Sequence, residues 1–174
     1  MNSKTKKQIV FICQAGIIAA LYTVLTLVSA AFGLASHEIQ VRISEALTVL
    51  PLFTPAAIPG LVIGCIVSNL ITGCMPLDVV FGSVATLVGA LGAYLIGIAA
   101  RKTDSTVLKV LIPFPNVISN TIIVPWVLKL VYGIDGAIPY FMLTVGIGEI
   151  ISGVVLGLPL LFVLDKHNKH IFKI

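Results

Sequence analysis

The chain has 174 residues, of which 58% are hydrophobic and only 10% are charged, and its formal net charge is +4. This composition is typical of a protein that crosses the membrane several times, and the length leaves no room for a soluble catalytic or nucleotide-binding domain. The basic residues lie at the ends of apolar runs rather than in one patch. They therefore indicate membrane topology and argue against a nucleic-acid partner.

The first apolar run covers about residues 8–33 and follows the basic residues Lys4, Lys6 and Lys7. A cleavable signal peptide is the alternative interpretation. The apolar core is longer than that of a typical signal peptide, and further apolar runs follow it. We therefore expect a first transmembrane helix, which needs about 20 residues.

The next apolar segment, residues 43–73, is too long for one upright span and too short for two full spans of about 20 residues each. Pro51, Pro55 and Pro59 make a straight helix unfavourable in its first half. If the segment crosses twice, nine of the 11 Lys and Arg residues lie on one side, which the positive-inside rule favours.

The charge distribution thus predicts an all-α integral membrane protein with six spans and both termini in the cytoplasm. Ser3 and Asn168 are then inside, and His37 and Ile134 are outside. We expect residues 1–174 to form one membrane domain, with spans at about 8–33, 43–54, 56–73, 78–100, 107–131 and 139–164.

Polar residues of several predicted spans lie at the outer end of the bundle or at mid-depth. Ionisable groups are costly in hydrocarbon, so such positions are candidates for function. Glu149, for example, lies about 15 Å into the last span from Pro139 at 1.5 Å per residue. The candidate ligand-binding residues are Arg42, Glu45, Asn69, Asp78, Asn120, Trp126 and Glu149.

Each of the more prominent candidates also has a purely structural interpretation. Glu149 could lock two helices through hydrogen bonds, and Glu45 could form a local ion pair with Arg42. Asp78 could cap the fourth span, and Trp126 could be an interfacial anchor rather than a stacking platform. The sequence leaves these alternatives open.

Small residues recur on the first span at Ala15, Gly16, Ala19 and Ala20. Such a face lets another helix approach closely. It predicts either a docking surface for a partner membrane subunit or packing inside the bundle. No motif of a nucleotide-binding loop, zinc protease or serine hydrolase is present, so we expect neither catalysis nor a metal or cofactor.

Three runs of the sequence closely resemble the QueT family: residues 40–51 (QVRISEALTVLP), 54–60 (TPAAIPG) and 78–86 (DVVFGSVAT). Members are substrate-binding (S) components of energy-coupling factor (ECF) importers for queuosine precursors. The resemblance implies a plasma-membrane protein that captures its ligand outside and reorients against a transmembrane coupling subunit. Two cytoplasmic ATPases would hydrolyse ATP. Ala15 and Ala19 match the spacing of the family's Ala-x-x-x-Ala docking surface.

The substrate that the resemblance implies is a 7-deazaguanine, such as the aminomethyl or cyano precursor of queuosine. A carboxylate can accept both its ring N–H and its exocyclic amine, and Trp126 could cover a ring face. Two other hypotheses are an autonomous ion-coupled carrier with Glu149 as proton relay and an S component for another vitamin or nucleobase-like micronutrient. An intramembrane enzyme is disfavoured because no nucleophile–base or metal set is visible.

Overall fold

The computed structural model describes residues 2–34 and 40–171, with side chains up to residue 167, and these residues form helices and connections without a β-strand. The prediction of an all-α protein is therefore confirmed for the described residues. The helices are α1 (Ser3–Ala31), the 3-10 helix η1 (Ile43–Leu52), α2 (Ala57–Ile71), α3 (Pro76–Thr103), α4 (Thr106–Leu111), α5 (Phe114–Leu130), α6 (Ile138–Glu149), the π-helix η2 (Ile150–Leu156) and α7 (Gly157–Ile171).

Four helical stretches are long and apolar enough to cross a membrane: Ser3–Ala31, Pro76–Thr103, Thr106–Leu130 and Ile138–His167. Residues 43–73, which are too long for one span and too short for two full spans, supply two shorter apolar helices, η1 and α2. The described residues thus contain six apolar helical stretches in all. At about 2.0 Å per residue for a 3-10 helix, η1 is only about 20 Å long, shorter than a hydrocarbon core of about 30 Å.

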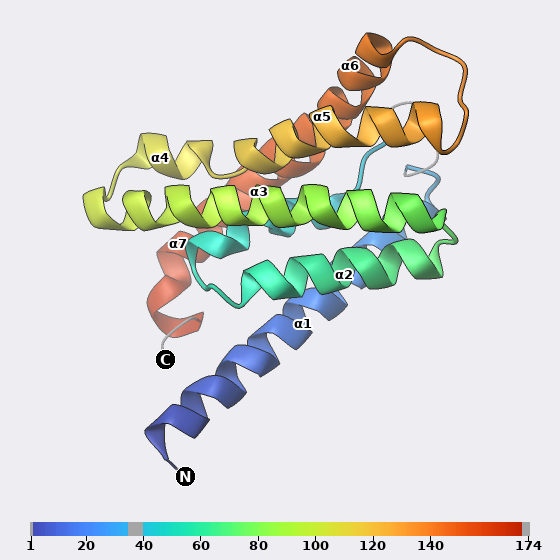
Figure 1. The fold of residues 1–174 in the computed structure, drawn as a ribbon. Helices are drawn as coiled ribbons and strands as arrows, with labels where there is room; N and C mark the ends of the chain where they lie inside the picture. The colour runs from blue at the N-terminus through green and yellow to red at the C-terminus, as the bar shows by residue number, and fades with distance from the viewer. Residues whose placement is uncertain (1, 35–39, 172–174) are drawn as a thin grey trace.

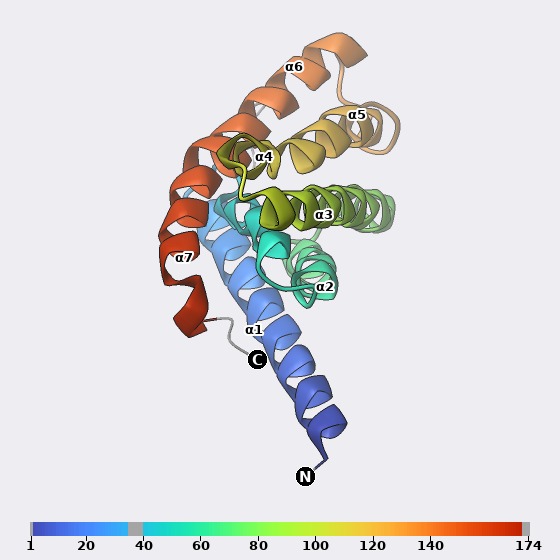
Figure 2. The ribbon, with the colours of Figure 1, turned by 90° about the vertical axis from the view of Figure 1, so that its left-hand side faces the viewer.

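The helices α2, α3 and α5 lie side by side, and α1 and the α6–α7 stretch cross beside them (Figures 1 and 2). Both ends of the chain lie at the same end of the bundle as the α3–α4 connection (Figure 1). The α2–α3 turn and the α5–α6 connection lie at the opposite end (Figure 1). A chain that crosses the membrane six times with both termini on one side must place these connections at opposite ends in this way.

The helix η1 occupies the centre of the bundle and contacts α1, α2, α3, η2 and α7. Every residue from Ser44 to Leu52 is buried. Its start is anchored on α1: the Thr26 hydroxyl donates to Ser44 Oγ at 2.7 Å, and Ser29 Oγ accepts from the Ile43 N–H at 2.9 Å. A helix this enclosed places its polar side chains inside the protein rather than against lipid.

Close helix contacts in the bundle depend on glycines. A Cβ at Gly60 would come within 2.8 Å of the Ala15 carbonyl oxygen, and one at Gly64 within 2.9 Å of the Ala19 carbonyl oxygen. Likewise, a Cβ at Gly89 of α3 would overlap Asn116 of α5. Small residues at these points let the backbones approach, as in other transmembrane helix pairs.

Ionic contacts tie the helices together at the end with the termini. Lys109 Nζ binds Asp104 at 2.7 Å and Asp165 at 3.0 Å, which joins α4 to α7. The hydrogen bond from Lys109 lowers the pKa of the exposed Asp104 carboxyl. Arg101 donates to the Leu52 carbonyl at the end of η1, and its guanidinium lies 5.9 Å from the centre of the Tyr94 ring. These non-covalent contacts therefore hold the helices together at this end of the bundle.

The side of the membrane that each end faces is tested by cysteine labelling. In a background in which Cys13, Cys65 and Cys74 are alanine, we expect Ile134→Cys to react with an impermeant maleimide in intact cells. Ser3→Cys should react only after permeabilisation. Labelling of both positions from outside would contradict six spans. The corresponding prediction for His37 lies outside the described residues.

Candidate functional site

A cavity of about 260 Å³, lined by both polar and apolar side chains, opens at the end of the bundle that carries the α2–α3 turn and the α5–α6 connection. Its volume lies just below the range of about 300–1,000 Å³ that is usual for ligand pockets, which indicates a small ligand. The lining residues are Gln40, Arg42, Glu45, Cys65, Cys74, Asp78, Gly82, Thr86, Asn120, Val124, Leu128, Tyr132, Ile134, Val145 and Glu149.

The side chain of Glu45 reaches the cavity from η1 and is fixed at both oxygens. Tyr22 of α1 donates its hydroxyl to Oε1, and Asn116 of α5 donates Nδ2 to Oε2 at 2.9 Å. Tyr22 and Asn116 are completely buried. Glu45 is therefore held in one orientation by two other helices.

Asn116 also links Glu45 to the second buried carboxylate. Its Nδ2 donates to Glu149 Oε2 at 3.2 Å, so one amide group bridges η1 and α6. Its Oδ1 is buried and has no hydrogen-bond partner among the described residues, because it packs closely against the bare backbone of Gly89. The amide thus sets the spacing between the two carboxylates. We refer to the lining residues Glu45, Asn120 and Glu149, together with Asn116, which bridges the two carboxylates, as the floor of the pocket.

Arg42 is the one Lys or Arg among the described residues that line the cavity. Its Nη1 donates to Asn69 Oδ1 at 3.2 Å, and its backbone N–H donates to Ser152 Oγ of η2 at 3.1 Å. In the described part of the chain, Arg42 forms no ion pair with Glu45. The local ion pair that the sequence allowed is therefore not what the structure shows.

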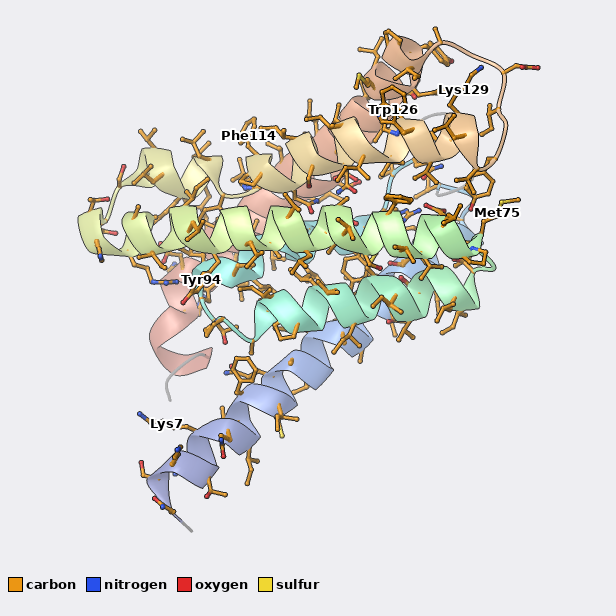
Figure 3. All side chains as sticks on the ribbon, in the orientation of Figure 1. Lys7, Met75, Tyr94, Phe114, Trp126 and Lys129 are labelled. Carbon is orange, nitrogen blue, oxygen red and sulfur yellow. The ribbon has the colours of Figure 1, made fainter. Side chains whose placement is uncertain are left out.

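The mouth of the pocket is organised by Asp78 and Tyr132. Tyr132, in the α5–α6 connection, donates its hydroxyl to Asp78 Oδ2 at 2.8 Å and accepts from the Met75 N–H at 3.2 Å. Met75 marks this end of the bundle in Figure 3. Burial, together with the adjacent Asp78 carboxylate, raises the pKa of the Tyr132 phenol, so the hydroxyl stays a donor at neutral pH.

The structure brings together six of the seven residues that the sequence suggested for ligand binding. Arg42, Glu45, Asp78, Asn120 and Glu149 line the cavity directly. Asn69 lies behind Arg42 and holds its guanidinium. Asp78 lies in the first turn of α3, but its side chain binds Tyr132 and makes no capping hydrogen bond. Sequence reasoning missed Tyr22, Thr86, Asn116 and Tyr132.

Trp126 is the exception, and the prediction that it forms a stacking platform in the pocket is corrected by the structure. Its side chain is 48% exposed and does not line the cavity. The pocket face of α5 carries Asn120, Val124 and Leu128, which follow one another at a spacing of four. Trp126 lies two residues from Val124 and projects from the opposite side of the helix (Figure 3). Its exposure fits the interfacial anchor that was the alternative.

The prediction of a docking surface on α1 needs a similar correction. Ala15 and Ala19 are buried, because the glycines of α2 pack against their backbone. This part of the small-residue face belongs to the interior of the bundle. Gly16 and Ala20 remain exposed on α1.

The fold and the cavity together define a class of protein: a multi-pass helical membrane protein with a pocket for a small ligand at one end of the bundle. The comparison with protein families adds the particular assignment. The model of the QueT transporter family matches residues 12–166, so the chain belongs to this family. No curated protein and no solved structure matches the chain in the two further comparisons. The role of the chain is therefore membrane transport, which agrees with the expectation that it is not an enzyme.

Proposed function

We propose that the chain is the substrate-binding S component of an ECF-type importer in the plasma membrane and that its ligand is a 7-deazaguanine precursor of queuosine. The observation that carries the proposal is the floor of the pocket, where Asn116 holds two carboxylates on one cavity. Membership of a transporter family supports it. The ligand would enter at the mouth, which faces outward in the predicted topology.

The chemistry of the floor suits the edge of a guanine-like base. Such an edge presents a ring N–H and an exocyclic amine, and a carboxylate accepts two neighbouring donors well. The Asn120 side chain lines the same cavity and can donate to a carbonyl oxygen or accept from an N–H. The Arg42 guanidinium adds a second donor group. A deazaguanine satisfies groups that would be costly to leave unpaired in the membrane.

In this proposal the chain binds the ligand, and partner subunits hydrolyse ATP. A transmembrane coupling subunit and two cytoplasmic ATPases would act on α1 and its neighbours. Of the small residues on α1, the exposed pair Gly16 and Ala20 is available to such a partner, whereas Ala15 and Ala19 are covered.

The test has two arms. First, the purified chain is analysed by mass spectrometry for co-purifying small molecules and titrated with the aminomethyl and cyano deazaguanines. Binding of either ligand by the chain alone supports an S component for this substrate class. Second, uptake is measured with and without the coupling module. Uptake that persists without the module and stops when the proton gradient is dissipated would support an ion-coupled carrier instead.

Large residues on α1 should separate docking from folding. We expect Gly16→Leu and Ala20→Leu to keep ligand affinity within about threefold of wild type while uptake falls at least tenfold, because only the approach of another helix is blocked. Ala15→Leu is the comparison: it forces α1 away from Gly60 and should reduce binding and uptake together. Equal loss of binding in Gly16→Leu would contradict docking at this face.

A further inference from the structure

The pocket is lined by more carboxyl groups than basic groups. Three carboxylates, Glu45, Asp78 and Glu149, line it together with one guanidinium, that of Arg42. Among the described residues, the ion pairs are those of Lys109, so no Lys or Arg nitrogen lies within 4.0 Å of a pocket carboxylate oxygen. Carboxylates enclosed in a membrane protein without a cation are costly. A positively charged ligand would reduce that cost.

The three carboxylates lie at two depths. Along α3 the lining runs from Asp78 through Gly82 to Thr86, and along α5 from Leu128 to Asn120. Eight residues of α-helix correspond to about 12 Å, so the mouth and the floor are separated by roughly that distance. Glu45 and Glu149 share Asn116 at the floor. Asp78 is the carboxylate at the mouth.

Asp78 is the pocket carboxylate at the mouth, and one of its oxygens borders the ligand space. Its Oδ2 accepts from Tyr132, but no described residue donates to Oδ1. Oδ1 lies 3.9 Å from the place where a Cβ of Gly82 would be, over the bare backbone that lines the cavity. The side chain is 8% exposed.

We propose that the ligand is bound as a cation, with its planar hydrogen-bonding edge on the floor and its protonated amine at Asp78 Oδ1. This rests on the proposed function and makes Asp78 the residue that distinguishes a cationic aminomethyl deazaguanine from the neutral cyano compound. Tyr132 is then a positioning residue, since its hydroxyl orients the carboxylate from the outer connection.

The experiment titrates both deazaguanines against wild type, Asp78→Asn and Glu149→Gln in detergent or nanodiscs. We expect wild type to bind the aminomethyl compound at least tenfold more tightly, because a charge-assisted hydrogen bond is gained only by the cation. Asp78→Asn should weaken the aminomethyl compound at least tenfold and change the cyano compound less than threefold. Glu149→Gln should weaken both ligands by similar factors.

Asp135→Asn is the matched control, since it removes an exposed carboxylate that does not line the pocket and should leave both affinities unchanged. Equal affinities in wild type would overturn the proposal, even if Asp78→Asn does not fold. A preference for the amine that disappears in Glu149→Gln and persists in Asp78→Asn would also overturn it. If neither ligand binds to wild type, the proposed substrate class itself is wrong and the assignment of Asp78 falls with it.

Discussion

Replacing Asn116 by leucine is expected to lower ligand affinity at least a hundredfold and to lower the melting temperature. Leucine has a similar branched shape, although it is larger, and it donates no hydrogen bond, so Glu45 and Glu149 each lose a donor. A hydrogen bond to a charged group contributes about 1.5–3 kcal/mol, so the loss of two such bonds weakens both the binding site and the fold. Calorimetric titration and thermal unfolding of the purified chain measure the two effects.

Ser119→Ala is the control for this substitution. Ser119 lies three residues along the same helix and donates to the Ala85 carbonyl at 2.9 Å, so its loss removes a neutral contact between α5 and α3 without touching a carboxylate. We expect an effect on stability of about 0.5–1.5 kcal/mol and affinity within threefold of wild type. If Asn116→Leu behaves like Ser119→Ala, the bridge between the carboxylates has no role in binding.

Gly148→Ala is expected to have the second large effect. A Cβ at this position would overlap the carbonyl of Gln40, where the chain leading into η1 crosses α6. Backbone atoms cannot rotate away as a side chain can, so this chain segment or the helix must move. The bond from the Arg42 N–H to Ser152 would be strained, and the neighbouring Glu149 would shift. Overpacking of this kind costs about 1–3 kcal/mol.

We expect at least a tenfold loss of affinity and reduced thermal stability for Gly148→Ala. Gly146→Ala, two residues earlier on α6, is the matched control, because its Cβ would lie 3.4 Å from the Thr121 hydroxyl oxygen, at the edge of ordinary contact. It should bind and unfold nearly as wild type does. Equal behaviour of the two variants would show that the crossing at Gly148 can relax.

The all-helical fold follows from hydropathy and charge, which depend on the bilayer and not on side-chain packing. The pocket carboxylates were also accessible from sequence, because an ionisable residue in an apolar run is conspicuous. Asn116 was not, since it follows Pro113, Phe114 and Pro115 and resembles the start of a span. Its role arises where α5 meets α3 at Gly89, a contact that no local pattern encodes.

Three other residues show how the phase of a helix decides which side a residue faces. The chemistry of Trp126 suggests a place in the pocket, but Asn120 and Val124 define the inward side of α5. The spacing of four therefore places Trp126 outside. For Ala15 and Ala19 the spacing is equally compatible with the interior and with a docking surface. Gly60 and Gly64 of α2 pack against Ala15 and Ala19, which places these two residues in the interior. This is a tertiary contact, which the spacing of residues along α1 does not predict.

The short length of α2 has a consequence for the surrounding lipid. At 1.5 Å per residue, α2 with its 15 residues is about 22 Å long, whereas α3 with 28 residues is about 42 Å. Both helices expose large apolar side chains, among them Leu70 on α2 and Leu95 on α3. The protein therefore presents two different hydrophobic thicknesses to one bilayer. We expect the membrane to become thinner beside α2, which relieves the mismatch at a cost of fractions of a kcal/mol per Å.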